Sequence, residues 1–367
     1  MFLHEKDQWF RFSWDDEPII PLLSTVRNRQ GRLWGRLSSM GFELQDKAEL
    51  EMRSLDVLKS SEIEGVALDP EVVRSSIARS LGLEYGGFSG STHDVDAVVE
   101  MTLDATYGYA TPLTEERLFT WHAALFPTGY SGLHKISLAR YRDDEMEVVS
   151  GPIGREKVHY RAPAPERVPA EMARFLAWFN SGDGPEEVLR AAIAHFWFVS
   201  IHPFDDGNGR IARALTDMVL ARSDASPRRF YSMSNQILVE RKAYYEVLES
   251  TQKGSGEISE WLIWFLSCLD DALVASETLL DSVMRAARFW QGCAMIVLSD
   301  RQRKVLRKLL DGFDGKLTSS KWRRITKTSQ DTALRDIQDL IAKGVLERES
   351  SQGRSTSYRI AERWFAE

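Results

Sequence analysis

The stretch of the chain best suited to chemistry reads His-Pro-Phe-Asp-Asp-Gly-Asn-Gly-Arg and covers residues 202–210. Pro203 disfavours helical geometry in the residue before it, so the apolar helix that comes first is expected to end near His202. This would place the imidazole at the mouth of the core rather than inside it. The glycine-rich turn at 207–209 can point successive backbone N–H groups at one spot, which suits an anion.

A second helix is predicted to begin near Asn208, because apolar residues recur at helical spacing as far as Val219. The positive end of its dipole would face the same turn. Arg210 and Arg213 lie three residues apart, so both side chains can reach along one helix face. The pattern predicts a phosphate cradle with two guanidinium groups, one carboxylate and one imidazole. The chain contains no GxxxxGK[ST] sequence, so phosphate binding is expected here.

Each of these features also has an ordinary structural explanation. A histidine beside an aromatic residue usually has a packing role, and Asp205-Asp206-Gly207 is a common type of turn. Arg213 can simply pair with Asp217, four residues later on the same helix. The features occur together within a short stretch, however, and this favours a functional site.

Signals along the rest of the chain predict a mainly helical protein. Asp69 and Pro70 are typical of a helix start, and Gly82 is expected to end that helix. The helix that opens after Pro185 is apolar on nearly every face between residues 188 and 201. Such a helix is typical of the centre of a bundle.

One segment is predicted to be a β-hairpin. Two short extended runs, at 145–149 and 157–160, flank glycine and proline residues at 151–154. Because an isolated hairpin is only marginally stable, it is expected to lie against the helical body.

The chain from residue 296 onward has a different composition. Residues 296–367 carry 16 Lys/Arg and 10 Asp/Glu, a net charge of +6, against −13 for residues 1–295. Three helices and then two extended runs are predicted there, at residues 300–310, 317–325, 330–343, 345–348 and 356–360. Three helices followed by a hairpin is the order of a winged helix, a variant of the helix-turn-helix.

Composition excludes several classes of protein. The 367 residues are 43% hydrophobic and 28% charged, which excludes a largely disordered chain. No apolar run approaches the roughly 20 residues that a membrane-spanning helix needs. Acidic residues occur near the N-terminus where a signal peptide would be apolar, so we expect a cytoplasmic protein. Cys268 and Cys293 are too few for a disulfide framework or a zinc cluster, and core thiols are expected.

The sequence from His202 to Arg213 resembles the Fic family motif HPFx[D/E]GNGRxxR at every defined position. The resemblance implies a mainly helical Fic-type bundle in which the predicted hairpin is a flap that holds a target segment by strand addition. Residues 233–236 and the pair Tyr244-Tyr245 resemble the adenine side of the family's site, so Asn235 and Tyr244 are expected to contact the nucleotide. The implied domains are an N-terminal helical domain at 1–90, a Fic core at 91–290 and a winged helix at 291–367.

The activity that this resemblance implies is transfer of AMP from ATP to a hydroxyl group of a protein. His202 would be the general base that takes the proton from a target Tyr, Thr or Ser. Asp206 would bind Mg²⁺ between the phosphates, since magnesium prefers carboxylate and phosphate oxygens.

The same resemblance assigns the remaining motif residues to phosphate binding. The anion hole would be formed by Gly207, Asn208 and Gly209, with Arg210 on the phosphates. Family members that transfer phosphate carry lysine at the position of Gly209, so glycine favours AMP transfer.

Residues 60–65 fit the family's inhibitory motif [S/T]xxxE[G/N], with Ser60, Glu64 and Gly65 at its fixed positions. A plain solvated glutamate before a helix end is the ordinary alternative. The resemblance implies that Glu64 forms a salt bridge with Arg213, which would otherwise bind the γ-phosphate. ATP would then bind in a non-productive pose.

Other functions remain open at this point. The basic C-terminal segment could make the chain a DNA-binding regulator, with Arg354 of the wing in a minor groove, although acids in the predicted helix 330–343 argue against this. The same cradle could transfer another phosphate-bearing group, such as phosphocholine, or remove AMP. Self-modification and a homodimer are further expectations.

Overall fold

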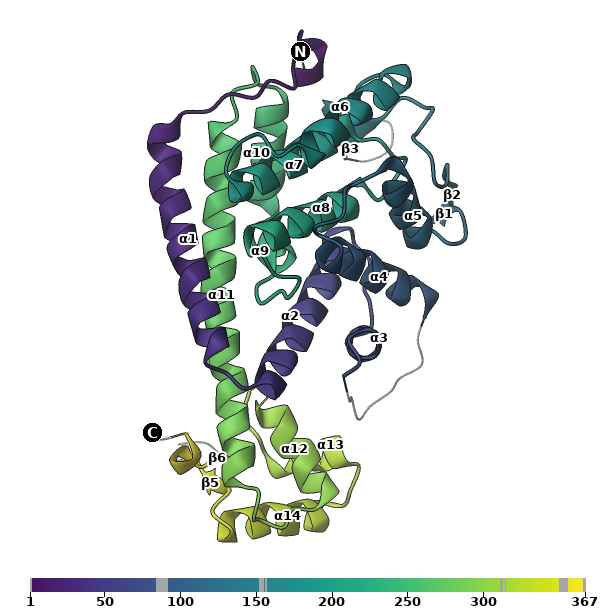
Figure 1. Ribbon diagram of the computed structural model, residues 1–367. Helices are drawn as coiled ribbons and strands as arrows, with labels where there is room; N and C mark the ends of the chain where they lie inside the picture. The colour runs from purple at the N-terminus through teal and green to yellow at the C-terminus, as the bar shows by residue number, and fades with distance from the viewer. Residues whose placement is uncertain are drawn as a thin grey trace. The chain divides into compact units, whose positions relative to one another are not determined.

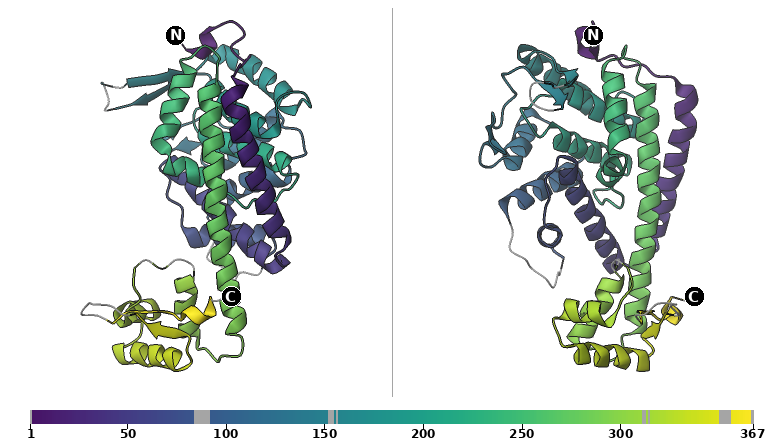
Figure 2. Two further views of the ribbon diagram at one scale, coloured as in Figure 1. Left: turned by 90° about the vertical axis from the view of Figure 1, so that its left-hand side faces the viewer. Right: turned by 180° about the vertical axis from the view of Figure 1, so that it is seen from behind.

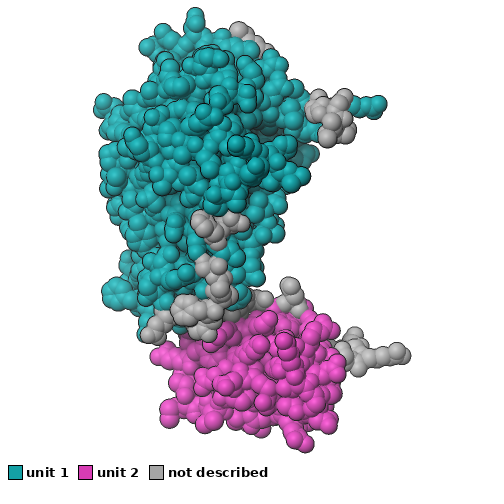
Figure 3. Space-filling view, turned by 90° about the vertical axis from the view of Figure 1, so that its right-hand side faces the viewer, with its two compact units in different colours: residues 1–276 teal, residues 277–367 magenta. Residues whose placement is uncertain are grey.

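The computed structural model describes residues 2–83, 92–151, 155, 157–310, 313, 315–349 and 356–365. The chain is mainly helical (Figure 1). It divides into two compact units, residues 1–276 and residues 277–367 (Figure 3). No helix in the described ranges is long and apolar enough to cross a membrane.

The helices of the first unit are α1 (Asp16–Ser38), α2 (Phe42–Ile63), α3 (Pro70–Ser80), α4 (His93–Tyr107), α5 (Glu115–Leu125), α6 (Val168–Asn180), α7 (Glu187–Ile201), α8 (Asn208–Ser223), α9 (Met233–Val239), α10 (Arg241–Gln252) and the first part of α11 (Ser259–Gly292). Short 3₁₀ helices lie at Leu3–Glu5 and Pro165–Arg167. Its strands form two antiparallel pairs: β1 (Tyr130–Ser131) with β2 (His134–Lys135), and β3 (Glu147–Ser150) with β4 (Lys157–Arg161).

Helices α7 and α8 form the centre of the first unit and pack against each other (Figure 1). Every residue of α7 from Val188 to Ile201 is buried, as the apolar sequence predicts. The Glu186 side chain caps the helix start by accepting from the backbone N–H of Val188 at 2.9 Å. The helix ends before His202, whose backbone is left-handed with φ of 51°. The expected end of this helix before Pro203 is therefore confirmed.

Other predicted element boundaries agree with the structure. Asp69 caps α3 through bonds from the backbone N–H groups of Glu71 and Val72, and Gly82 follows that helix with φ of 67°. The β3–β4 hairpin occupies the predicted segment, and β4 packs against α10. The glycine and proline residues at 152–154 lie outside the described residues.

The N-terminal segment packs on the core rather than forming a separate body. Trp9 and Phe12 contact the ring of Trp197 of α7, at centroid distances of 6.4 and 5.6 Å. Helix α1 runs beside α11 (Figures 1 and 2), and Arg29 pairs with Asp270 across this contact at 2.5 Å. The aromatic residues near the N-terminus thus serve packing.

The chain forms two compact units, while the three domains expected from the sequence, at 1–90, 91–290 and 291–367, stay a prediction. Within the first unit, α2 packs against α8 and α9. The second unit begins at Glu277, inside α11, which continues without a break to Gly292.

The second unit contains the last part of α11 and the helices α12 (Asp300–Leu310), α13 (Ser319–Thr326) and α14 (Gln330–Ala342). Strands β5 (Leu346–Arg348) and β6 (Tyr358–Ile360) form an antiparallel hairpin, and Leu317 bridges to Tyr358 beside it. A 3₁₀ turn lies at Glu362–Trp364. This is the predicted order of helices and strands. Arg354 lies outside the described residues.

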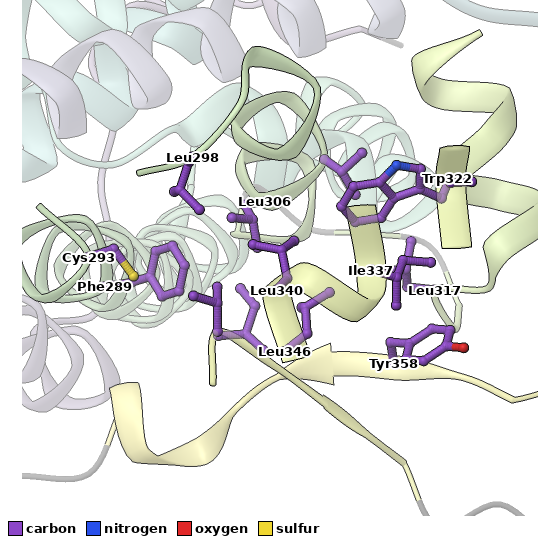
Figure 4. Packing of buried hydrophobic residues seen from close by; sticks show 14 residues of the cluster. Phe289, Cys293, Leu298, Leu306, Leu317, Trp322, Ile337, Leu340, Leu346 and Tyr358 are labelled. Atoms are coloured by element: carbon purple, nitrogen blue, oxygen red, sulfur yellow. The ribbon is translucent and has the colours of Figure 1, made fainter. Parts of the chain in front are cut away.

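An apolar cluster of its own holds the second unit together. Trp322 of α13, Ile337 and Leu340 of α14 and Leu346 of β5 converge in it (Figure 4). Cys293 also belongs to this cluster, while Cys268 is buried in the first unit, and both are free thiols as expected.

Candidate active site

His202 lies half-buried where α7 ends. Its Nδ1 lies 3.2 Å from the carbonyl oxygen of Val199, so the Nδ1–H tautomer donates there and leaves Nε2 as a proton acceptor. Arg142 Nε donates to the His202 carbonyl oxygen at 2.8 Å and holds the backbone in place. Burial lowers the pKa of His202 to about 4, so the ring is neutral at physiological pH.

The glycine-rich turn leads directly into α8. Gly207 has φ of 84°, and a Cβ there would lie 2.9 Å from Phe126 Cε2, so only glycine fits both the backbone and the space. The Asn208 side chain bonds both the N–H and the carbonyl of Phe204, at 3.0 and 2.8 Å. This side chain therefore fixes the turn, and only backbone N–H groups at the start of α8 remain for an anion.

Asp206 lies at the edge of this turn. Its carboxylate accepts from Gly207 N–H at 2.5 Å and from the Ser131 hydroxyl, and one oxygen lies 4.0 Å from Arg210 Nη2. The side chain remains 43% exposed. Among the described residues no cluster of three or more His, Cys, Asp or Glu could hold a metal. A single accessible carboxylate beside an anion cradle nevertheless fits Mg²⁺, which takes most of its ligands from phosphate and water.

Arg210 is buried in the wall of the site. Its guanidinium lies over the Phe126 ring at 4.8 Å, and its Nε has no hydrogen-bond partner among the described residues. Burial lowers its pKa, although it stays charged at neutral pH. A desolvated guanidinium with an unused donor is suited to an incoming phosphate.

Arg213 is held by the end of α2. It donates from Nε to the Ser60 hydroxyl at 2.9 Å and from Nη2 to the Ser60 carbonyl at 2.9 Å and to Glu64 Oε1 at 2.8 Å. Its side chain is 4% exposed and that of Glu64 is 30% exposed. The structure thus brings Ser60 and Glu64 of the inhibitory motif into contact with Arg213. Asp217 pairs instead with Arg229, at 2.9 Å, so the alternative Arg213–Asp217 pair does not form.

The end of α2 comes very close to the glycine-rich turn. Glu64 follows the last residue of α2, and Gly65 turns the chain away with φ of 79°. A Cβ on Gly209 would collide with Glu64 Oε1 and would lie 3.2 Å from Arg213 Nη1. Glycine at 209 therefore leaves room for the Glu64 carboxylate beside Arg213.

The two residues expected on the adenine side differ in position. Asn235 is half-buried near the start of α9, where its N–H is capped by the Ser232 hydroxyl at 3.0 Å. Tyr244 is only 3% exposed, and its hydroxyl lies 3.0 Å from His195 Nε2 inside the core. Its neighbour Tyr245 is 41% exposed. The geometry therefore favours Tyr245 over Tyr244 as the residue that meets a ligand.

Three residues that line or support the site were not identified from the sequence. Phe126 packs under Gly207 and Arg210, Ser131 bonds Asp206, and His122 stacks on Phe204 at 4.3 Å. They lie on α5, directly after it and on β1, far away in sequence from the motif. His122, a histidine among the apolar residues of α5, is the local sequence signal that could have pointed to them.

The fold and site together define a helical bundle with a glycine-rich turn, an imidazole and two guanidinium groups where its two central helices meet. Residues 112–220 match the model of the Fic/DOC family, so the chain contains a Fic/DOC domain. Residues 2–83 match a domain of unknown function, DUF4172.

Individual relatives agree with this assignment. Protein adenylyltransferase Fic of Nematostella vectensis is 33% identical over 155 residues, covering 40% of this chain and 31% of that protein. Uridine 5'-monophosphate transferase of Xanthomonas campestris is 29% identical over 133 residues, covering 32% of this chain and 22% of that protein. The chain thus spans less than a third of the length of the curated relatives it matches.

Solved structures show the same fold. A Fic family protein from Desulfovibrio desulfuricans has a TM-score of 0.53 at 20% identity and covers 94% of this chain and 96% of its own. A Fic domain containing signaling protein from Bacteroides thetaiotaomicron has a TM-score of 0.51 at 21% identity, covering 72% of this chain and 98% of its own.

Proposed function

We propose that this protein is an adenylyltransferase that moves AMP from ATP to a Tyr, Thr or Ser hydroxyl of a target protein or of itself. The observation that carries this proposal is the neutral imidazole of His202, with Nε2 available, beside the anion-binding start of α8. The names of the relatives with the same domain support the choice of a nucleotidyl group.

His202 acts as the general base in this proposal. Its Nε2 takes the proton of the target hydroxyl while the oxygen attacks the α-phosphorus in line. The bond from the α-phosphorus to the bridging oxygen breaks, and pyrophosphate leaves. Backbone N–H groups of Asn208 and Gly209 and the guanidinium of Arg210 neutralise the charge that builds on the phosphates. Gly207 shapes the turn that aims these groups.

Mg²⁺ would be held on the protein side by Asp206, with the other ligands from ATP and water. Bound there, the ion supplies charge neutralisation to the phosphates. Asp206 is kept in position by Gly207 N–H and Ser131, so its free lone pairs point away from those bonds.

The nucleotide's base lies, in this proposal, near Asn235 and the pair Tyr244-Tyr245. Tyr245 offers an exposed ring face for stacking, and Tyr244 supports it from the core at a centroid distance of 4.9 Å. The hairpin β3–β4 is the candidate dock for a target strand.

Glu64 and Ser60 keep the site in an off state in this proposal. Arg213 would reach the γ-phosphate of a productively bound ATP, but its guanidinium is engaged by α2. A buried guanidinium with three good acceptors does not leave them readily for a phosphate that approaches from solvent. Activation requires that the end of α2 moves.

A second candidate reaction is transfer of UMP by the same residues, favoured by the likeness to the uridine 5'-monophosphate transferase. Phosphocholine transfer and AMP removal by a water bound to Glu64 use the same cradle. Incubating the Glu64→Gly protein and a lysate with ATP or UTP, each labelled at the α-phosphate, separates adenylylation from uridylylation. Label from ATP on protein supports adenylylation, label from UTP alone replaces it with uridylylation, and label from neither contradicts nucleotidyl transfer.

A further inference from the structure

We propose that the second compact unit, residues 277–367, binds duplex DNA through the outward faces of α13 and α14. This function is separate from the transferase activity and does not rest on it. The argument starts from how the charges of this unit are paired.

Most acidic side chains in the described part of this unit are neutralised inside it. Asp336 of α14 accepts from Arg301 of α12 at 3.0 and 3.1 Å, and Asp339 pairs with Lys343 at 2.5 Å. The other ion pairs are Glu347–Arg359, Glu362–Arg359 and Glu349–Lys316. These acids therefore add little negative potential to the surface.

Unlike the acids, many cationic side chains of the unit have no ion-pair partner among the described residues. Exposed cationic side chains that make no ion pair with another described residue include Arg303, Lys304, Arg307, Lys308, Arg323, Arg324, Lys327, Arg335 and Arg348. The net +6 of residues 296–367 is thus concentrated in solvent-exposed positive groups. Unpaired surface cations of this density favour a polyanionic partner.

The acids of α14 argue against a DNA-reading helix only as long as they are unpaired. Asp336 is 9% exposed and bound to Arg301. The Asp339 side chain is 45% exposed, but it accepts from Lys343 at 2.5 Å and from Gln302 of α12 at 2.7 Å. Both are therefore committed to contacts with other side chains. In the described unit Asp331, in the first turn, is the one acid of α14 without such a pair.

The exposed residues of α14 include two side chains that suit base recognition. Arg335 and Gln338 are exposed and three residues apart, so they share one helix face. Arginine and glutamine are the side chains that make bidentate bonds to guanine and adenine in the major groove. An α-helix fits that groove in B-form DNA but not the narrow groove of A-form RNA, which favours DNA.

In this proposal, α13 contacts the phosphate backbone of the DNA while α14 lies in the groove. Arg323, Arg324 and Lys327 are exposed at its end, immediately before the short turn into α14. Lys327 takes the left-handed conformation, with φ of 54°, that reverses the chain toward Ser329, the cap of α14. In a helix-turn-helix the first helix crosses the phosphate backbone while the second enters the groove.

The test measures the fluorescence anisotropy of a labelled random-sequence duplex with the full-length chain. We expect binding whose affinity falls roughly 100-fold between 50 and 200 mM salt, as for about four neutralised phosphates. The His202→Ala protein should bind equally, because the transferase site takes no part. No binding at 50 mM salt, or tighter binding to an RNA duplex of the same sequence, would overturn the proposal.

Charge-reversal variants locate the surface. Arg323→Glu with Arg324→Glu should weaken binding at least tenfold and reduce the salt slope by about two. The matched control reverses two exposed cations of the first unit, Arg140→Glu with Lys242→Glu, and should bind like the wild type. Equal loss in both variants would mean that net charge and not this surface carries binding, which contradicts the proposal.

Sequence reading is tested with a milder change. Arg335→Ala leaves the fold-holding contacts of α14 in place, since its side chain is exposed. In duplexes selected from a random pool, we expect this variant to lose a preference at one base position. An unchanged selected sequence would contradict the assignment of α14 to the groove.

Discussion

Arg213 of α8 donates a hydrogen bond to Glu64 Oε1 at 2.8 Å, across the contact between the end of α2 and the glycine-rich turn. The same guanidinium donates twice to Ser60. Since the Arg213 side chain is 4% exposed, its remaining donors have little access to solvent. A phosphate that needs this arginine must therefore displace Glu64.

The first prediction concerns this contact. Glu64→Gly should raise transfer of label from α-phosphate-labelled ATP at least tenfold, because it frees Arg213 for the γ-phosphate. Ser60→Ala removes one of the two Ser60 acceptors and should give a smaller increase. Initial rates of labelling at fixed protein concentration measure both effects.

Glu62→Gly is the matched control for that prediction. Glu62 lies two residues earlier in α2, is exposed and pairs only with Lys59, at 2.7 Å. It carries the same cost of a glycine near a helix end without touching Arg213. An equal rise in labelling by this control would show that a loosened helix, and not the released arginine, causes activation.

The second prediction uses the close approach at Gly209. Gly209→Ala should displace the Glu64 carboxylate from Arg213 and cost about 1 kcal/mol of stability, the scale of the lost hydrogen bond. In the Glu64→Gly background the same change should cost much less. Urea unfolding of the four proteins gives the coupling energy. Additive costs would contradict the contact.

The third prediction separates the two neighbouring tyrosines. Tyr245→Ala should raise the KM for ATP with little loss of stability, because its ring is exposed. Tyr244→Phe should leave the KM nearly unchanged but cost about 1 kcal/mol, because it removes the bond to His195. The reverse pattern would restore Tyr244 as the nucleotide contact that the sequence suggested.

The fourth prediction concerns buried histidines and pH. Burial lowers the pKa of His122 to about 4 and that of His195 to about 3, below the ordinary value near 6.5. At a pH between its folded-state pKa and 6.5, each of these histidines binds a proton only in the unfolded chain. Each histidine should therefore reduce the free energy of unfolding by about 1.4 kcal/mol for each pH unit below 6.5.

Urea unfolding between pH 7.5 and pH 5 tests this, with His122→Gln against the exposed His134→Gln. Asp217, whose pKa burial raises to about 8, acts in the opposite direction as the pH rises. Because it contributes equally to both variants, the difference in slope isolates the histidine. An unchanged slope in His122→Gln would contradict the burial argument.

Local sequence signals correctly predicted where several helices begin and end. Pro203 fixed the end of α7, and the cap at Asp69 fixed the start of α3, because both act on the adjacent backbone. The motif also predicted that Glu64 would meet Arg213, which the structure contains. These features depend on residues that are close together in sequence, or on a motif whose family implies the fold.

Features that depend on distant packing were not predicted. Ser131 and Phe126 complete the site from segments whose own sequence gives no chemical signal. The resemblance pointed to the pair Tyr244-Tyr245 but not to which ring is buried, and the structure buries Tyr244 and leaves Tyr245 41% exposed. The boundary between the compact units at Glu277 has no local sequence signal, since α11 runs through it without a glycine or proline there.

The most direct test of the proposed chemistry is the labelling of protein by α-phosphate-labelled ATP and Mg²⁺ in a lysate with added Glu64→Gly chain. The account predicts labelled bands that disappear when His202→Ala is combined with Glu64→Gly, and a mass increase of one AMP on a hydroxyl residue. Labelling that persists without the His202 imidazole, or an absence of label with both proteins folded, would contradict it.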